Sequence, residues 1–289
     1  MGEEAEKTST QQRSPTSTRQ HHFVLVHGIC HGAWCWYKIT ALLEKAGHRV
    51  SAVDLVGAGI DRDDADAVRT FAEYNMPLED LLLALPQGEK VILVGHSAGG
   101  LSLTHAIRTF PDKIELAVYV SATMLRSGFC GPQDLQEGVP NLIEYGNVFE
   151  ESFGLGHNLP PTSSKIKKEF LRKIFYQLSP VEWPAAITGT GSPSTSPAWD
   201  AALGSMLMRS GPSMALITAK FEAGEERVDE VKRVCIKSSH DLVLKPEQQD
   251  AMIKRWPPSQ VYTVEGDHSP FFSAPAQLVG ALIQAAASI

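Results

Sequence analysis

The segment that decides the fold spans residues 90–100 and reads KVILVGHSAGG. Residues 90–94 are apolar at every position after the lysine, which predicts a strand covered on both faces. The glycines and the alanine around Ser97 permit a sharp turn from this strand into a helix, which we expect over residues 98–109. Such a turn strains the backbone of its serine and exposes the hydroxyl above the sheet. We therefore predict that Ser97 is the nucleophile of a serine hydrolase. The alternative is a glycine-rich junction whose serine has no role.

Short apolar runs alternate with longer amphipathic patterns on both sides of this segment. Strands that are apolar on nearly every residue, separated by helices, are typical of a parallel sheet with helices on both faces. We therefore predict an α/β protein with a mostly parallel sheet. The expected strands cover residues 23–26, 49–53, 90–94, 116–120, 231–236 and 260–264, and the expected helices cover residues 36–46, 71–85, 98–109, 247–255 and 274–286.

The alternation stops between residues 125 and 212, where Gly, Pro and Ser become frequent. We predict that residues 125–212 form an inserted, partly helical cap, and that residues 21–124 and 213–289 form the core. Residues 165–178 carry apolar side chains at helical spacing, which predicts an amphipathic helix within the cap. Residues 188–197 consist of Thr, Gly, Ser and Pro, which is typical of a mobile loop.

The composition favours a protein that acts on a small molecule. With 289 residues, 43% of them hydrophobic, the chain can bury a large core. Its formal net charge is -7, and it has no run of Lys and Arg and no interleaving of basic with aromatic residues. These features argue against a nucleic-acid or anionic-membrane surface. The sequence leaves open whether the chain forms a homodimer.

The cysteines and the first twenty residues bear on the compartment. Cysteines at positions 30, 35, 130 and 235 have neither the density of a disulfide scaffold nor the spacing of a zinc site, so we expect free thiols. Residues 1–20 are polar with early glutamates, which predicts a disordered tail rather than a secretory signal or transit peptide. No stretch approaches the roughly 18 uninterrupted apolar residues of a membrane span. We expect a soluble, cytoplasmic protein.

A serine nucleophile needs a histidine to take its proton and an acid to orient that histidine, in the chain order Ser, Asp, His for the α/β-hydrolase fold. His268 meets this order, because it lies in a loop just after the strand expected at residues 260–264, where open α/β sheets bind ligands. Asp241 follows the strand expected at residues 231–236 and is our candidate for the acid. Asp267 is the rival, but a side chain next to the histidine in sequence rarely reaches back to its ring.

The tetrahedral intermediate of acyl transfer also needs hydrogen-bond donors for its oxyanion. The Ala98 N–H is one candidate, because it follows the nucleophile at the start of the helix. The loop HGICHG at residues 27–32 follows the first strand, and we predict that the Ile29 N–H is the second donor, with Gly28 allowing close approach of the backbone. The pattern GAG at residues 57–59 lacks the third glycine of a dinucleotide fingerprint, so we predict no cofactor and no metal.

Three segments of the chain resemble the plant methylesterase and hydroxynitrile lyase family of α/β-hydrolases. They are FVLVHGICHGAWCWYK at residues 23–38, LLEKAGHRV at 42–50 with VDL at 53–55, and KVILVGHSAGG at 90–100. The resemblance implies an α/β-hydrolase fold with a cap that shapes the pocket. It also implies roles for five residues: Ser97, Asp241 and His268 fall where the family has its catalytic triad, and Ile29 and Ala98 fall where it has its oxyanion hole.

Two positions separate the branches of this family. The lyases carry a threonine and a lysine where this sequence has Gly28 and Ser269, so we expect both residues in the substrate site and no cation to stabilise departing cyanide. Family esterases usually have a methionine at the position of Ser269. We therefore predict a carboxylesterase for small esters, above all methyl esters of plant hormones or metabolites, that forms an acyl-enzyme on Ser97. Two alternatives stay open, namely a slow or non-catalytic receptor with a hydrolase fold and a hydroxynitrile lyase.

Overall fold

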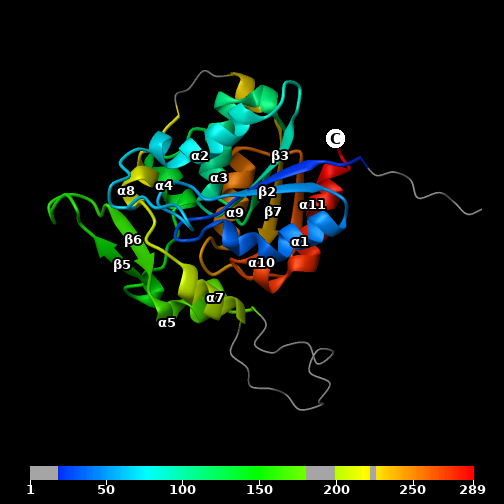
Figure 1. Ribbon diagram of the computed structural model, residues 1–289. Helices are drawn as coiled ribbons and strands as arrows, with labels where there is room; N and C mark the ends of the chain where they lie inside the picture. Colours follow the sequence, from blue (N-terminus) through cyan, green and yellow to red (C-terminus); the bar gives the residue numbers. More distant parts are fainter. Residues whose placement is uncertain (1–18, 180–198, 222–225) are drawn as a thin grey trace, which may run out of the picture.

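A six-stranded parallel sheet forms the centre of the molecule (Figure 1). The computed structural model describes residues 19–179, 199–221 and 226–289. The spatial order of the strands is β2-β1-β3-β4-β7-β8, so the chain starts near one edge and adds its last strand at the other. The strands are β1 (His22–Val26), β2 (Arg49–Val53), β3 (Val91–His96), β4 (Ile114–Val120), β7 (Lys232–Ser238) and β8 (Gln260–Val264).

Helices cover both faces of this sheet because alternate residues of the central strands enter two different cores (Figure 1). In β1, Phe23 and Leu25 belong to one core, whereas Val24 and Val26 belong to the other. The first core also holds residues of α1 and α11, and the second holds residues of α2, α3 and α9. The predicted mostly parallel sheet with helices on both faces is therefore confirmed. These helices are α1 (Tyr37–Lys45), α2 (Phe71–Ala84), α3 (Gly99–Thr109), α9 (Pro246–Arg255) and α11 (Pro275–Ala286).

The core elements begin and end within a residue or two of the predicted positions, because local signals mark their ends. At the start of α2, the Thr70 hydroxyl accepts a hydrogen bond from the Glu73 N–H, and the Glu73 carboxylate accepts one from the Thr70 N–H. Shorter helical segments complete the core: η1 (Ala33–Trp36), η2 (Pro111–Lys113), α8 (Ser213–Ile217), η5 (Glu226–Asp229) and α10 (Pro270–Ser273).

Residues 125–212 add short elements beside the sheet and contain a small sheet of their own, which the sequence analysis did not anticipate. The strands β5 and β6 pair antiparallel in this insertion. The predicted tail up to residue 18 and the predicted loop at 188–197 lie outside the described residues. The described elements of the insertion are α4 (Pro132–Gly138), η3 (Ile143–Tyr145), β5 (Phe149–Ser152), β6 (Ser163–Ile166), α5 (Lys168–Phe170), the π-helical η4 (Leu171–Phe175) and α7 (Trp199–Leu207).

The predicted helix at residues 165–178 is wrong over part of its length. Ile166 belongs to β6, where it pairs with Phe149, and helical structure starts only at Lys168 and ends at Phe175. A short apolar run fits a strand end as well as a helix, and here long-range pairing with β5 decides for the strand. The helical spacing holds from Leu171 to Phe175, whose apolar side chains are buried in the first core.

Buried polar contacts connect the insertion to the core. The Asp200 carboxylate of α7 accepts hydrogen bonds from Lys38 Nζ at 2.7 Å and from the Tyr37 hydroxyl at 2.8 Å. At the other end of the insertion, the Asp66 carboxylate accepts hydrogen bonds from Ser152 at 2.7 Å and from Thr162. Hydrogen bonds to the buried carboxylate of Asp200 and the half-buried carboxylate of Asp66 help to fix the orientation of the insertion.

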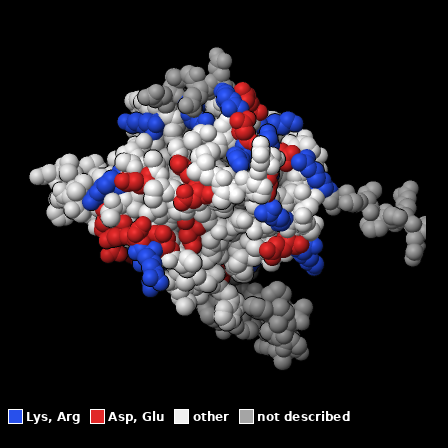
Figure 2. Space-filling view, turned by 45° about the horizontal axis from the view of Figure 1, so that its top comes forward, with Lys and Arg blue, Asp and Glu red and all other residues white. Residues whose placement is uncertain are grey.

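The surface carries charges of both signs. On the face drawn in Figure 2, acidic and basic side chains are interspersed among the described residues. None of the helices in the described ranges has both the length and the apolar character that a membrane crossing requires. All four cysteines are free thiols, and only Cys130 is exposed.

Candidate active site

Ser97 lies in the turn between β3 and α3 with φ at +54°, a left-handed conformation that residues with side chains rarely adopt. The turn is fixed by the Ser97 carbonyl, which accepts hydrogen bonds from the N–H groups of Gly100 and Thr123, both at 3.0 Å. Close packing leaves no room for larger residues, since a Cβ at Gly99 would lie 2.6 Å from the His27 carbonyl oxygen. The sharp turn predicted from the small residues is therefore present.

The Ser97 hydroxyl ends a chain of hydrogen bonds. His268 Nε2 lies 3.0 Å from Ser97 Oγ, and His268 Nδ1 lies 3.0 and 2.9 Å from the two carboxylate oxygens of Asp241. Asp241 follows β7 and His268 follows β8, so the carboxyl ends of parallel strands bring the three side chains together. Because the Nδ1 proton is donated to a carboxylate, the lone pair of Nε2 faces the serine hydroxyl.

The Asp241 carboxylate is completely buried and rigidly held. Its Oδ1 accepts hydrogen bonds from the Val243 N–H at 2.8 Å and the Leu244 N–H at 2.9 Å. The side chain of Gln249 lies 3.4 Å from Oδ2. These contacts fix the direction of the carboxylate toward the imidazole of His268.

Asp267, the rival carboxylate, makes other contacts. It accepts hydrogen bonds from the Ser273 hydroxyl at 2.8 Å and from the N–H groups of Ser269 and Leu178, both at 2.9 Å. Burial raises the pKa of Asp267 above its ordinary value. Its role is to connect the loop that carries His268 to the insertion.

His96, which the sequence analysis did not assign a role, supports the loop of His268. His96 Nε2 donates a hydrogen bond to the His268 carbonyl oxygen at 2.7 Å, and the two ring centres are 4.8 Å apart. Burial lowers the pKa of His96 well below its ordinary value, and the neighbouring His268 adds to this effect. The neutral ring therefore donates through Nε2 and positions the backbone of the loop that carries His268. Its place directly before Ser97 was a signal that could have found it.

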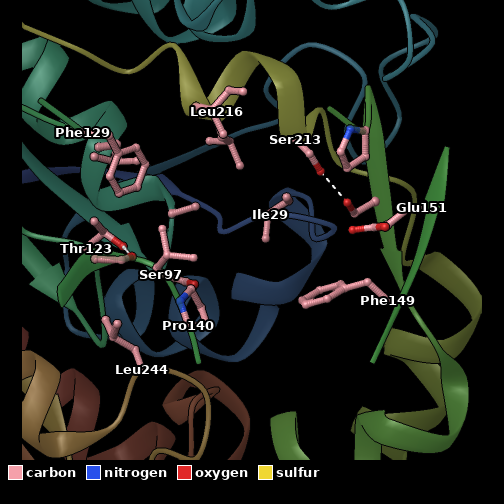
Figure 3. A pocket seen from close by; sticks show the side chains of 17 residues that line it. Ile29, Ser97, Thr123, Phe129, Pro140, Phe149, Glu151, Ser213, Leu216 and Leu244 are labelled. Carbon is pink, nitrogen blue, oxygen red and sulfur yellow. Dashed lines mark hydrogen bonds between the residues drawn. The ribbon is translucent and has the colours of Figure 1, made fainter. Parts of the chain in front are cut away.

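The side of Ser97 turned away from the core borders a cavity of about 280 Å³ (Figure 3). Apolar side chains dominate its walls, with Phe129 and Phe149 from the insertion and Leu216 from α8. In the described part of the chain, none of the residues that line it is Lys or Arg. The lining residues with polar side chains are Ser97, Thr123, Glu151, Ser164 and Ser213.

The peptide bond between Gly28 and Ile29 is fixed by two histidines. His27 Nε2 accepts a hydrogen bond from the Leu55 N–H at 3.1 Å, so the His27 proton resides on Nδ1, which donates to the Gly28 carbonyl at 2.8 Å. The His31 N–H donates to the same carbonyl at 3.3 Å. Because N–H and C=O point in opposite directions in a trans peptide, these bonds also fix the direction of the Ile29 N–H.

The peptide bond between Ser97 and Ala98 is fixed in the same way. The Ser97 carbonyl accepts two hydrogen bonds, so the Ala98 N–H points away from them. Ile29 and Ala98 both line the cavity together with Ser97. In the part of the chain that the structure describes, neither N–H donates a hydrogen bond to another residue. The N–H groups of Ile29 and Ala98 are therefore two oriented hydrogen-bond donors on residues that line the cavity. An oxyanion site requires such donors.

Gly28 and Ser269, the two residues expected to contact the substrate, lie near Ser97 and His268 but are not among the residues that line the cavity. A Cβ at Gly28 would be 2.8 Å from the Cβ of Ser97 and 3.0 Å from His96 Nδ1, so a larger residue there would displace the serine. Ser269 is fully buried, and its N–H bonds to Asp267. The structure does not include Gly28 or Ser269 in the lining of the cavity. The walls come instead from insertion residues such as Phe149 and Glu151, for which the sequence offered no signal.

Comparison with known proteins agrees with this arrangement. Residues 23–281 match the model of a family described as the alpha/beta hydrolase family. The chain belongs to the alpha/beta hydrolase family. Within the family, it is 50% identical over 276 residues to Methylesterase 17 of Arabidopsis thaliana, with 94% of each chain covered. It is 40% identical over 265 residues to Pheophorbidase of Raphanus sativus, with 91% of this chain and 93% of the relative covered.

A solved alpha/beta hydrolase structure extends this likeness to three dimensions. The methylesterase protein MES16 from Arabidopsis is similar with a TM-score of 0.78 and 38% sequence identity, covering 93% of this chain and 100% of that one. The predicted relationship to plant methylesterases is therefore confirmed. Among the described residues of this alpha/beta hydrolase, no three His, Cys, Asp or Glu side chains gather as a metal site would require.

Proposed function

We propose that this chain is a carboxylesterase that hydrolyses small methyl esters through Ser97, His268 and Asp241. The observation that carries the proposal is the unbroken chain of hydrogen bonds from the Asp241 carboxylate through His268 to the Ser97 hydroxyl, beside a mainly apolar cavity. The similarity to proteins named as methylesterases supports the choice of methyl esters among carboxylic esters.

Acylation begins when Ser97 Oγ attacks the ester carbonyl carbon and its proton moves to His268 Nε2, 3.0 Å away. The carbonyl oxygen becomes an oxyanion in the tetrahedral intermediate. His268 then gives the proton to the departing methoxy oxygen, the C–O bond breaks, and methanol leaves an acyl group on Ser97. In the second half, His268 takes a proton from water, the hydroxide attacks the acyl carbon, and Ser97 Oγ leaves with the proton returned by His268.

Asp241 acts through His268 without transferring a proton. Its carboxylate oxygens lie 3.0 and 2.9 Å from His268 Nδ1 and accept the Nδ1 proton in a hydrogen bond. The carboxylate also stabilises the imidazolium that forms when His268 takes the serine proton. The backbone N–H groups of Val243 and Leu244 keep the carboxylate in place during this change. Deeply buried charges interact strongly, which makes this support effective.

The Ile29 and Ala98 N–H groups form the proposed oxyanion hole. Their directions are fixed by the anchored carbonyls of Gly28 and Ser97, and neither has another acceptor among the described residues. A donor of this kind is worth about 3 kcal/mol in the transition state. Its loss therefore slows acyl transfer by roughly two orders of magnitude.

The walls of the cavity favour an esterase over a lyase. Among the residues that the structure describes, no lysine or arginine lines the cavity, so none of these supplies a cation to stabilise departing cyanide. Apolar walls instead suit the acid part of a hydrophobic ester. We assign the cap to residues 125–212, which supply the Phe129 and Phe149 side chains of those walls.

Hydrolysis of a panel of methyl esters of aryl and alkyl carboxylic acids, followed by release of the acid, tests the proposal. The wild-type protein is expected to turn over many times, and Ser97→Ala is expected to be inactive. Ser102→Ala is a matched control, because Ser102 lies in α3 and its buried hydroxyl has no hydrogen-bond partner to lose. Equal rates for wild type and Ser97→Ala would contradict the proposal. Tight binding of an ester with a single turnover would favour a receptor instead.

A further inference from the structure

Glu151 brings an acidic side chain to the wall of an otherwise mainly apolar cavity. It lies on β5 two residues after Phe149, and both residues line the cavity because alternate residues of a strand share one face. Glu150, between them, is exposed and is not part of the lining. In the view of Figure 3, Phe149 and Glu151 lie on one side of Ile29 and Ser97 lies on the other.

Two serines extend the polar character of this part of the wall. Ser164 of β6 is the direct partner of Glu151 in the antiparallel pair, and its hydroxyl lies 2.5 Å from the hydroxyl of Ser213 at the start of α8 (Figure 3). One hydroxyl donates to the other, so the pair retains one free proton and several acceptor lone pairs. We call Glu151, Ser164 and Ser213 the polar corner.

The polar corner has more hydrogen-bond acceptors than donors. Within the described ranges, the Glu151 carboxylate makes no ion pair or hydrogen bond with another residue, although many other carboxylates of the chain do. The described residues of the lining include no Lys or Arg that could neutralise it. Glu151 lines the cavity but is also exposed to solvent, so water partly screens its charge. The carboxylate still attracts a cation or a hydrogen-bond donor and repels an anion.

We infer that the polar corner selects methyl esters whose acid part carries a cationic, N–H or O–H donor group at the end remote from the ester. Apolar walls bind the middle of such a substrate, Ser97 attacks its ester end, and Glu151 accepts the hydrogen bond from its remote end. Esters that carry a second carboxylate at that end are disfavoured by repulsion from Glu151. This inference rests on the proposed esterase function of the same cavity.

Four methyl 3-phenylpropanoates test the inference, with aminomethyl, hydroxymethyl, ethyl or carboxylate groups at the para position. The first three groups are close in size, so the ratio of their kcat/KM values reports on hydrogen bonding and charge. In Glu151→Gln, the ratio of aminomethyl to ethyl ester is expected to fall about tenfold from its wild-type value. In the same variant, kcat/KM for the carboxylate ester is expected to rise relative to kcat/KM for the ethyl ester. Raising the ionic strength lowers the wild-type preference for the aminomethyl ester, because Glu151 is exposed to solvent on one side.

Glu150→Gln is the matched control, because it removes the same charge from the opposite face of the same strand. It is expected to keep the wild-type ratios. Ser213→Ala is a second variant, expected to lower the ratio of hydroxymethyl to ethyl ester about threefold, as the loss of a neutral hydrogen bond does.

Two results separate the inference from the proposed function. If Glu151→Gln hydrolyses the esters with the wild-type ratios, the inference is overturned and the esterase function stands. If wild-type protein hydrolyses none of the four esters, and no ester of the wider panel, the proposed function fails and takes the inference with it.

Discussion

The core and the insertion both contribute walls to the same cavity, but by different means. On the core side, the Asp241 carboxylate and the His268 side chain are buried, and Asp241 is held by hydrogen bonds from the N–H groups of Val243 and Leu244. On the insertion side, the wall is formed by short elements such as the four-residue strand β5. Phe149 and Glu151 on that strand are partly or largely exposed.

This difference between the core and the insertion suggests that the proposed reaction and the choice of ester depend on different parts of the chain. Elements of the parallel sheet fix the reactive groups because each strand is paired on both sides or covered by helices. The insertion packs apolar side chains such as Ile174 and Phe175 into the first core and adds polar contacts, including the ion pair of Lys38 with Asp200. Its part of the cavity wall nevertheless comes from short elements at the surface. We therefore expect changes in the core to reduce the rate for every ester, and changes in the insertion to alter which ester is preferred.

The largest effect is expected for Ser97→Ala. Removal of the nucleophile leaves only the proposed oxyanion donors and the cavity, so kcat for any methyl ester is expected to fall about 10⁵-fold. Steady-state kinetics with an unchanged thermal unfolding midpoint would check that the loss is chemical. A residual rate above a hundredth of wild type would mean that another group attacks the ester.

A loss of about 10⁴-fold in kcat is expected for Asp241→Asn, because the amide no longer holds the Nδ1 proton of His268 and the ring presents the wrong tautomer. Asp267→Asn is the comparison, since Asp267 does not contact the His268 ring and is expected to retain most of the rate. The two variants should be measured with the same ester at neutral pH. Equal losses in both would remove the distinction between these carboxylates.

The stability of the core is also expected to fall at acidic pH. Burial lowers the pKa values of His27, His31 and His96, that of His31 to about 3. In the unfolded chain these pKa values return to about 6.5, so the unfolded state binds more protons below that pH. The free energy of unfolding therefore falls as the pH drops from about 6.5, by up to about 1.4 kcal/mol per pH unit for each histidine.

Chemical denaturation between pH 7 and 4 measures this dependence. The slope of the unfolding free energy against pH is expected to be smaller in His31→Gln, by the amount that corresponds to about one proton. It is expected to stay unchanged in His157→Gln, which alters an exposed histidine of the insertion. The same slope in His31→Gln and wild type would show that His31 is protonated in the folded protein.

The smallest effect on ester hydrolysis is expected for a substitution in the insertion. Phe149→Ala removes part of the apolar wall and is expected to raise KM for aromatic methyl esters about tenfold, with kcat changed less than threefold. Glu150→Ala on the outer face of the same strand is the control. A large fall in kcat instead would mean that the insertion positions the reacting groups and does more than select the substrate.

The core could be predicted from the sequence because its signals are local and repeated. Residues 90–100 alone indicate the strand, the turn and the helix, and the continuous apolar runs on either side mark strands buried on both faces. The chain order of Ser97, Asp241 and His268 led to three side chains that the structure places within hydrogen-bonding distance. The supporting contact of His96 was missed because it joins the end of β3 to a loop 172 residues later in the chain.

The insertion could not be predicted in this way. The strands β5 and β6 read FEES and SSKI, which lack the apolar alternation that marks a half-buried strand. Ser164 is held by pairing with Glu151 and with Gly211, far apart in sequence. Because these contacts are long-range, neither the small sheet nor the place of Glu151 on the cavity wall left a local pattern.

The anchored carbonyls of Gly28 and Ser97 have a consequence for the cost of each catalytic cycle. In water, solvent dipoles must turn toward a developing negative charge, and that reorientation contributes to the barrier of ester hydrolysis. Here the two amide dipoles at Ile29 and Ala98 take their direction when the chain folds, through hydrogen bonds that do not change during the reaction. On the proposed mechanism, folding aligns the two N–H groups with the oxyanion once. In water, solvent molecules would have to reorient for every ester molecule that reacts.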